Sequence, residues 1–391
     1  MKEWLSQPAI LAAVSEATGE RHASWLELFF DLVAVAGVAQ LSHLVHTTTS
    51  WADAGLYVVC FLAFWTAWMC FTVYGNVRRD DARVAPVLGA MLGLAFMAAA
   101  VDEVGGERAR PFAIAYILVR VLADRVWQQR GSLRVVVDWP VVQVGTGVVP
   151  WIVSLWAEGP WRYGLWALGL AFDLWLTFTV AGERMVEGFQ RRQQGRRRDV
   201  PVPEFVHLDP AHIGERLGLF MIIVLGEGVL VVTEALAGAG HWTAPLYGTA
   251  TGALALLAAL WAVALRLGFG GIPFLGAHAL PPRLMLPLHC LTAGIVAALA
   301  SGLGDLVAHD ELTPGTRWLV CGAVAALGVI GAGAGLAAGR RWWWALAVVL
   351  PVLVLPGLAG GLETGPRATV WLLAAALALQ GIITRVRATR Q

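Results

Sequence analysis

The amino-acid sequence is dominated by apolar segments, each about as long as a bilayer is thick. A helix needs about 20 apolar residues to cross the hydrocarbon core, and twelve segments of this kind follow one another. Of the 391 residues, 58% are hydrophobic and 14% are charged, whereas soluble domains carry about 25% charged residues. We therefore predict an all-α polytopic membrane protein with about twelve transmembrane helices. The segments cover residues 24–46, 54–75, 84–102, 111–128, 135–157, 161–182, 212–236, 245–268, 284–304, 316–338, 342–361 and 367–386.

Basic residues are distributed unevenly between the two sides that this map creates. With both termini on one side, 21 of the 28 Lys and Arg residues fall on that side and five on the other. Cytoplasmic loops of membrane proteins carry the excess of Lys and Arg. The map therefore predicts a multi-pass protein of the cell membrane with cytoplasmic N and C termini. Residues 1–20 lack the pattern of a cleavable signal, so the first span is expected to direct insertion.

A basic polar stretch, which includes QRRQQGRRRDVPVP, divides the chain into two parts. We predict an N-terminal six-helix half (1–182), a basic cytoplasmic linker (183–211) and a C-terminal six-helix half (212–391). A Glu-Arg pair precedes or opens both the first and the seventh span, as Glu20-Arg21 and Glu215-Arg216. Because each half would contain an even number of spans, the halves would be parallel repeats.

Several functional classes find no support in the sequence. The net charge of +1 gives no reason to expect a nucleic-acid partner. There is no glycine-rich phosphate loop ending in Gly-Lys-Ser/Thr. The histidines lack the further ligands that a metal site needs, and the four cysteines lie singly in apolar runs. We therefore expect no enzyme, no catalytic residue, no metal and no cofactor.

Acidic residues inside the apolar segments are the candidates for function. Glu20, Glu27 and Asp31 are spaced by seven and then four residues, which places them on one face of a helix. Glu227 lies near the middle of the seventh span, and Arg216 lies eleven residues before it on the same face. Neither Asp31 nor Glu227 has a basic residue one turn away on its own helix. A buried carboxyl group of this kind can bind and release a proton near neutral pH.

Three further charged residues lie in the fourth and sixth spans. Arg120 and Asp124 are four residues apart and therefore neighbours on one helix, and Asp173 lies within the sixth span. Each charge at the bilayer centre costs about 2.5–3.5 kcal/mol, so these side chains must face one another, a basic partner or water. Two interpretations stay open for most of them. Arg120 and Asp124 form either a structural ion pair or part of a site, and Glu27 either pairs with Arg21 or takes part in function.

Two stretches resemble the bacterial low temperature requirement protein A (LtrA) family. They are ERHASWLELFFDLV at 20–33, followed by AQLSH at 39–43, and HIGERLGLFMIIVLGE at 212–227. The resemblance implies a multi-span membrane protein linked to growth at low temperature, without a settled biochemical activity. The residues that match its motifs are Glu20, Arg21, Trp25, Glu27, Phe30, Asp31, Glu215, Arg216 and Glu227.

A weaker similarity is to potassium channels built from six-helix repeats. In those channels the first helix carries an Arg followed by Phe-Ser-Asp. Arg21 and Phe29-Phe30-Asp31 would be the counterpart here, with Phe30 in the position of the serine. The seventh span has no Asp at the matching place, so the channel is retained as an alternative.

The leading hypothesis is a secondary transporter of an unknown small solute, driven by an ion gradient and most simply by protons. The first and seventh spans would face each other across one cavity. Asp31 and Glu227 would carry the coupling ion or a cationic group, and Arg120 and Arg216 would balance them or bind an anion. The alternatives are a cation channel and a non-transporting scaffold or lipid-sensing protein. The expected partners are the bilayer and the solute, and self-association is left open.

Overall fold

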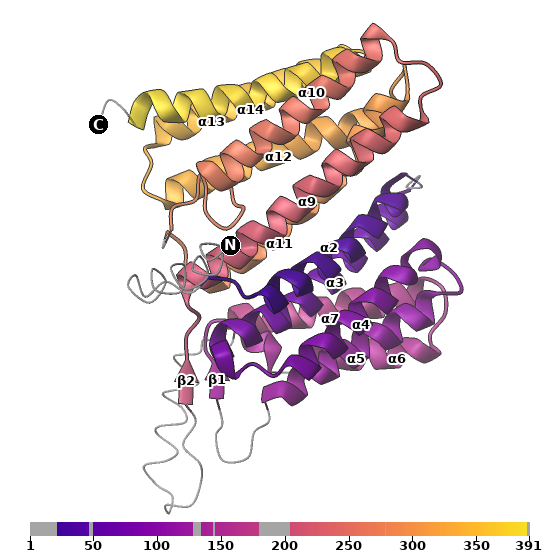
Figure 1. Cartoon of the computed structure of the whole chain (residues 1–391), viewed down its shortest axis with the longest axis vertical. Helices are drawn as coiled ribbons and strands as arrows, with labels where there is room; N and C mark the ends of the chain where they lie inside the picture. The colour runs from indigo at the N-terminus through magenta and orange to yellow at the C-terminus, as the bar shows by residue number, and fades with distance from the viewer. Residues whose placement is uncertain are drawn as a thin grey trace, which may run out of the picture.

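The computed structural model describes residues 22–46, 50–127, 134–143, 145–179, 204–277 and 279–388. In these ranges the chain forms twelve α-helices and one two-stranded sheet, arranged in two layers (Figure 1). Helices α2–α7 form one layer and helices α9–α14 form the other. The fold class predicted from the apolar segments is confirmed as nearly all-helical.

The first layer follows the expected spans closely, with one exception. Ser50 begins α3 with a reciprocal cap, in which its side chain accepts from the backbone of Asp53 and Asp53 accepts from the backbone of Ser50. The α-helices of this layer are α2 (Trp25–His46), α3 (Trp51–Arg78), α4 (Val84–Ala99), α5 (Ala109–Trp127), α6 (Val148–Val153) and α7 (Pro160–Thr179).

The exception is the fifth predicted span, at 135–157, which is not a continuous helix. It begins with strand β1 (Arg134–Val136), continues through 3-10 turns at Pro140–Val142 and Gly145–Gly147, and ends in the six-residue helix α6. Proline and glycine interrupt the backbone here, because proline lacks an N–H donor and glycine weakens a helix. The prediction of a single transmembrane helix in this segment is therefore wrong.

Strand β1 pairs with β2 (Glu204–Val206), which directly precedes the second layer. The two strands lie side by side (Figure 1) and are parallel, and in their register Val135 is opposite Phe205. The backbone N–H of Leu208 also donates to the carboxylate of Asp138 at 2.8 Å. The chain that enters the second layer is therefore attached to the first layer. Most of the predicted linker, together with the Glu20-Arg21 pair, lies outside the described residues.

The second layer contains the six helices predicted for it. Helix α9 begins at a proline after Asp209, whose side chain accepts from the backbone N–H groups of Ala211 and His212. A short π-helix at Ala262–Arg266 extends α10. The α-helices are α9 (Pro210–Gly238), α10 (Ala244–Trp261), α11 (Pro282–Ala308), α12 (Pro314–Ala337), α13 (Trp342–Gly361) and α14 (Pro366–Ala388).

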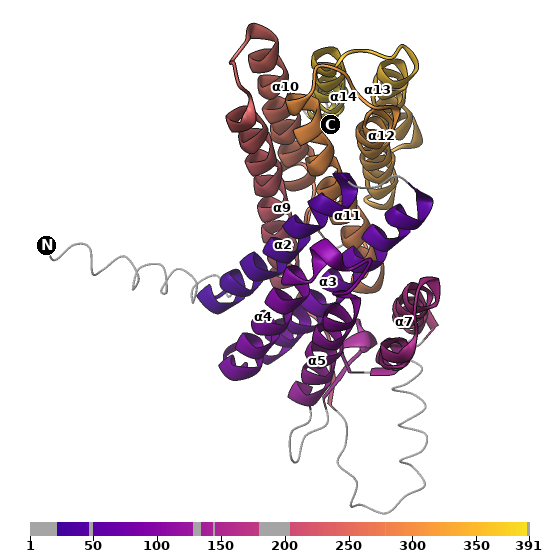
Figure 2. The same ribbon diagram turned by 90° about the vertical axis from the view of Figure 1, so that its right-hand side faces the viewer.

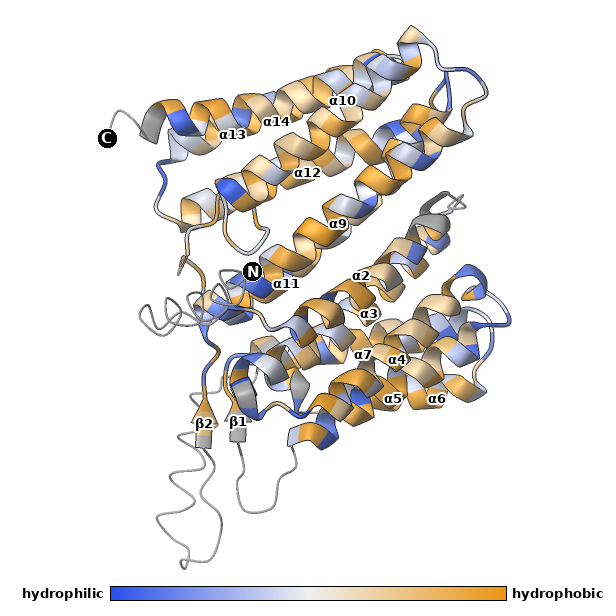
Figure 3. Cartoon of the chain, in the orientation of Figure 1, coloured by the Kyte–Doolittle hydropathy of each residue, from blue (hydrophilic) through white to orange (hydrophobic). Residues whose placement is uncertain are grey.

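The two layers meet where α2 and α3 pack against α9 and α11 (Figures 1 and 2). The outward surfaces of the helices carry large apolar side chains, and polar residues concentrate at the helix ends (Figure 3). Seven helices are long and apolar enough to cross a membrane among the residues described. These features are those of a polytopic membrane protein. The number of twelve spans and the parallel repeat stay predictions.

Candidate functional site

The site begins at the first turn of α2, where Ser24 and Glu27 cap each other. The N–H of Glu27 donates to the hydroxyl of Ser24 at 3.3 Å, and the N–H of Ser24 donates to the carboxylate of Glu27 at 2.8 Å. The same carboxylate meets Nη1 of Arg216 on α9 at 3.1 Å. Glu215 accepts from the backbone of Ala23, so α9 also holds the residues before α2.

Asp31 forms the deepest part of this site and is paired with Arg216. Nε of Arg216 donates to Oδ2 of Asp31 at 2.8 Å, and Nη2 donates to Oδ1 at 2.5 Å. The exposed fractions are 0% for Asp31 and 1% for Arg216. The indole of Trp68 on α3 donates to Oδ1 of Asp31 at 2.7 Å. Such a bidentate pair is geometrically specific, and the added donor helps to satisfy a buried carboxylate.

A second group of hydrogen bonds joins α3 to the start of α9. The side chain of Asn76 donates to the carbonyl of Asp209 at 3.1 Å and accepts from its N–H at 2.9 Å. Nδ2 of Asn76 also lies 3.2 Å from Nδ1 of His212. If this nitrogen accepts, the ring carries its proton on Nε2, which lies 3.6 Å from Glu27. We call Glu27, Asp31, Asn76, His212 and Arg216 the charged network.

Helix α3 can approach this network closely because residue 75 is glycine. A Cβ atom at Gly75 would lie 2.6 Å from Oε1 of Glu27 and 3.7 Å from Nη1 of Arg216. Any larger residue would displace the carboxylate. The glycine therefore allows three helices to share one ion pair.

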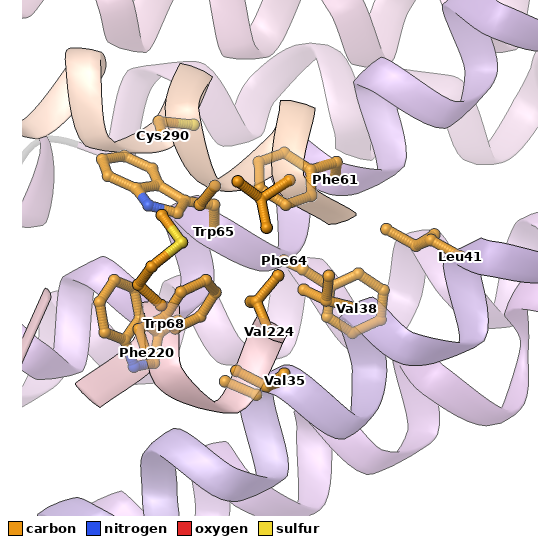
Figure 4. Packing of buried hydrophobic residues seen from close by; sticks show 14 of the residues in the cluster. Val35, Val38, Leu41, Phe61, Phe64, Trp65, Trp68, Phe220, Val224 and Cys290 are labelled. Atoms are coloured by element: carbon orange, nitrogen blue, oxygen red, sulfur yellow. The ribbon is translucent and has the colours of Figure 1, made fainter. Parts of the chain in front are cut away.

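Four rings lie next to the network and define the aromatic cluster: Trp65, Trp68, Phe220 and His289. The Trp68 and Phe220 rings lie side by side with centroids 4.3 Å apart (Figure 4). The ring centroid of His289 lies 6.0 Å from that of Trp68. The indole of Trp65 donates to Nδ1 of His289 at 3.2 Å. The other ring nitrogen then carries the proton and donates to the carbonyl of Leu217 at 3.1 Å. All four rings are buried.

On the other side of Trp65 lies a cavity of about 1410 Å³ between the two layers. Its walls come from α3, α7, α11, α12 and the segment before α6. It reaches exposed residues such as Ser50, Glu311 and Thr313, at the end of the bundle where α3 begins and α11 ends. Trp65 lies 14 residues into α3, so the cavity extends about 20 Å from that end.

One carboxylate predicted for the site, that of Asp173, lines this cavity. Nη1 of Arg120 donates to it at 2.5 Å, and the same guanidinium contacts the hydroxyl of Tyr116 and the carbonyl of Val141. Asp173 also lies against Gly147, where an added Cβ atom would clash with its carboxylate. The broken segment at 135–157 therefore provides space for this ion pair.

The partner of Arg120 is thus Asp173 and not Asp124, which was the neighbour expected from helical spacing. Asp124 is half-buried on α5 and does not line the cavity. The alternative pairing of Glu27 with Arg21 stays a prediction, because Arg21 lies outside the described residues. Glu27 pairs with Arg216.

Asp31 and Glu227 do not come together, contrary to the leading hypothesis. Glu227 is half-buried on α9, eleven residues and about 16 Å along the axis from Arg216, the partner of Asp31. Neither carboxylate is among the residues that line the large cavity. The prediction of one water-filled chamber shared by these two residues is therefore wrong.

The remaining motif residues have separate surroundings. Trp25 starts α2 and is 88% exposed, whereas Phe30 is buried and its ring centroid lies 5.7 Å from that of Phe71. Glu20 lies outside the described residues. The two stretches on which the resemblance rests thus supply most of the charged network.

A family model for the "Bacterial low temperature requirement A protein (LtrA)" matches residues 22–381. The chain belongs to this family. Among curated proteins, the "Uncharacterized protein RA0937" of Rhizobium meliloti (strain 1021) is 27% identical to this LtrA protein over 233 residues. The match covers 56% of this chain and 52% of the relative, so it spans about half of that relative's length. No solved structure matches.

Sequence reasoning did not identify several residues of this LtrA site. Asn76 belongs to the charged network, and Trp68 and Gly75 contact the network from α3. Trp65 and His289 lie between the network and the cavity. A signal was present in α3, because its second half combines aromatic, amide and glycine residues in a membrane helix. Their partners lie more than 30 residues away in sequence, so spacing alone does not pair them.

Proposed function

We propose that this LtrA-family protein is a secondary transporter of a small solute, driven by an ion gradient, with protons as the leading candidate. The observation that carries the proposal is the cavity between the two layers, which reaches exposed residues at one end of the bundle and is lined further in by Trp65 of the aromatic cluster. A transporter needs a site near the middle of the membrane that is reached from one side at a time. A cavity that reaches exposed residues at one end of the bundle supports the proposal.

We assign the contact with the ion or solute to Asp173, in place of Asp31 and Glu227. Asp173 lines the cavity, and its carboxylate is paired with Arg120. Protonation of Asp173, or a cation that competes with the guanidinium, would weaken this pair. Occupancy of the cavity and the position of α7 relative to α5 would then depend on each other.

In this proposal the charged network closes the end of the bundle opposite the mouth of the cavity. It joins α2, α3 and α9 through Arg216. Separating these helices would break buried ion pairs, but it would also admit water that solvates the separated charges. The free energy needed to separate these helices is therefore lower than the burial of the ion pairs suggests.

We also propose how the protein is oriented in the membrane and in which membrane it lies. The end with the charged network carries Arg78, Arg79 and Arg83, as expected of the cytoplasmic side. Both termini would then be cytoplasmic and the cavity would open outward, in the cell membrane. The bilayer and the solute are the proposed partners. Self-association, and the absence of a nucleic-acid partner, an enzymatic activity, a metal or a cofactor, stay predictions.

Transport currents from reconstituted protein test the function. Proteoliposomes on a solid-supported membrane would be exposed, under an imposed pH gradient, to panels of amino acids, sugars, organic anions and organic cations. At least one class should give a transient current that falls at least tenfold in Asp173→Asn and persists in Asp124→Asn, the half-buried carboxylate outside the cavity. Steady currents without coupled proton movement would indicate a channel. Failure of every panel would indicate a non-transporting membrane protein.

A further inference from the structure

The hydrogen bonds around Asn76 fix the orientation of its side-chain amide. Oδ1 of Asn76 accepts from the backbone N–H of Asp209 at 2.9 Å, and a backbone N–H can only donate. Nδ2 of the same amide lies 3.1 Å from the backbone carbonyl of Asp209 and 3.2 Å from Nδ1 of His212. The oxygen and the nitrogen of this amide are therefore identified by their partners.

This orientation determines which nitrogen of His212 carries the proton. Asn76 donates one N–H to the carbonyl of Asp209 and the other to Nδ1 of His212. Because Nδ1 accepts, the ring is neutral and its proton is on Nε2. In a protonated ring both nitrogens are donors. Protonation of His212 would therefore set two N–H donors against each other and break this contact between α3 and α9.

The other side of the ring is directed at Glu27. Nε2 of His212 lies 3.6 Å from Oε2 of Glu27, beyond the length of a hydrogen bond, and has no hydrogen-bond partner among the described residues. His212 is 1% exposed, but it directly follows the exposed residues Pro210 and Ala211 at the end of the bundle. A ring released from Asn76 is thus already next to a carboxylate. Protonation would exchange a contact of α9 with α3 for a contact of α9 with α2.

Other charged and titratable groups surround His212 and the residues beside it. Among these residue types, histidine is the one whose charge ordinarily changes between about pH 5 and 8. His289 is deeper in the bundle and is fully buried, whereas His22 and His207 are exposed. The groups are Glu27 and Asp31 of α2, Arg79 after α3, Asp209, Glu215 and Arg216 of α9, His289 of α11, and His22, Asp138 and His207 of the adjoining segments.

We infer that His212 is a proton-binding site of the charged network, at which protonation releases Asn76 and separates the end of α3 from the start of α9. The inference rests on the proposed function and deepens it, because it names the residue through which protons would open the closure opposite the cavity. The closed arrangement needs the neutral ring. Closure should therefore persist at high pH and loosen as the pH falls.

The separation can be measured by electron paramagnetic resonance on the full chain in nanodiscs, without solute and without a pH gradient. Spin labels would be attached at Asp81→Cys and Ala211→Cys, exposed positions after α3 and at the start of α9, in a variant without native cysteines. Lowering the pH from about 8 to about 5 covers the range in which histidine ordinarily changes charge. The mean distance between the labels should increase by about 2–5 Å, the size of known helix shifts.

Two variants should abolish this increase for different chemical reasons. In His212→Asn the ring is absent, so no proton is bound there. In Asn76→Asp the new carboxylate can still accept from the N–H of Asp209, and it also accepts from an Nδ1–H of His212, so protonation no longer breaks the contact. The matched controls are His22→Gln and His207→Gln, which replace exposed histidines at the same end and should keep the wild-type increase.

A label distance in the otherwise wild-type chain that is the same at both pH values would overturn the inference, whether or not the variants fold. So would an increase that persists in His212→Asn, or one that is lost in either control. The measurement uses no solute, so the two proposals can fail separately. A pH-dependent distance without any transport current would contradict the proposed function alone. A transport current without a pH-dependent distance would contradict the role of His212 alone.

Discussion

Arg216 is the residue on which the charged network depends, because one guanidinium meets two carboxylates of another helix. It contacts Glu27 and Asp31 and is 1% exposed. Removing one partner of a buried ion pair leaves an uncompensated charge, which costs about 3–5 kcal/mol. Replacing both partners with apolar side chains costs much less, since neither charge then has to leave water.

Arg216→Met should therefore lower the free energy of unfolding by about 3–5 kcal/mol. The double variant Asp31→Leu/Arg216→Met should recover part of that loss, because it removes the buried charge of Asp31 and leaves only that of Glu27 without its arginine. Thermal unfolding in detergent would give the two values. Glu227→Gln, on the same helix and half-buried, serves as the control and should change stability less than Arg216→Met. A double variant as unstable as the sum of its single variants would show that the two residues do not interact.

The ion pairs show what single-residue reasoning can predict. Asp31, Glu27, Arg216, Arg120 and Asp173 were all named from the sequence as candidate site residues, and the structure pairs them with one another. Their partners were not predictable from spacing, because helical neighbours share a face while ion pairs form between helices. The charge of Arg120 is met from α7 and not by the residue one turn away.

At the scale of elements, α3 connects the two parts of the site. Trp65 lines the cavity, Trp68 donates to Asp31, and Gly75 lies against Glu27. Because these residues belong to one helix, a shift of α3 along its axis would alter the cavity wall and the charged network together. Close packing at Gly75 fixes the position of the helix at one end.

Gly75→Ala should lower the free energy of unfolding by about 1–3 kcal/mol, the usual cost of overpacking. The added methyl group would lie within 2.6 Å of Glu27 and would disturb its contacts with both Arg216 and the cap of α2. Gly55→Ala is the matched control on the same helix, since nothing lies within 4 Å of its Cβ position. It should leave stability unchanged or raise it by up to about 1 kcal/mol. Equal effects of both substitutions would remove the packing argument.

Hydropathy predicted the elements well where a helix is continuous. Eleven of the twelve expected segments coincide with a helix, because apolar length alone defines a long membrane helix. The segment at 135–157 is also apolar on average. Its mean hydropathy therefore does not reveal the positions at which the helix is interrupted. Pro140 and Gly147 were the visible signals, and their effect is to place Asp173 beside the cavity.

At the scale of the whole molecule, the cavity depends on how the two layers meet. They pack through α2, α3, α9 and α11 and diverge on the side of α7 and α12 (Figure 2). Because the walls come from both layers, a change in their relative position would change access to Asp173. Neither layer alone would form the site.

Solvent access at the depth of the cavity can be measured with single cysteines in a variant without native cysteines. Val58→Cys and Leu291→Cys, which line the cavity and are 51% and 53% exposed, should react with a membrane-impermeant thiol reagent added from the side of the mouth. Leu92→Cys on α4 is 60% exposed but outside the cavity, so it should contact lipid and react at least tenfold more slowly. Equal rates at all three positions would mean that the cavity is filled by lipid.

The parallel pairing of β1 with β2 has a consequence for how the protein can be assembled. Strand β2 lies between the basic stretch and α9, and its pairing with β1 anchors the chain at that point to the first layer. The two layers are then held together by these contacts and do not need an unbroken chain between residues 180 and 203. Two separately synthesised fragments, one ending after α7 and one starting at β2, would retain every interlayer contact on which the proposed activity rests.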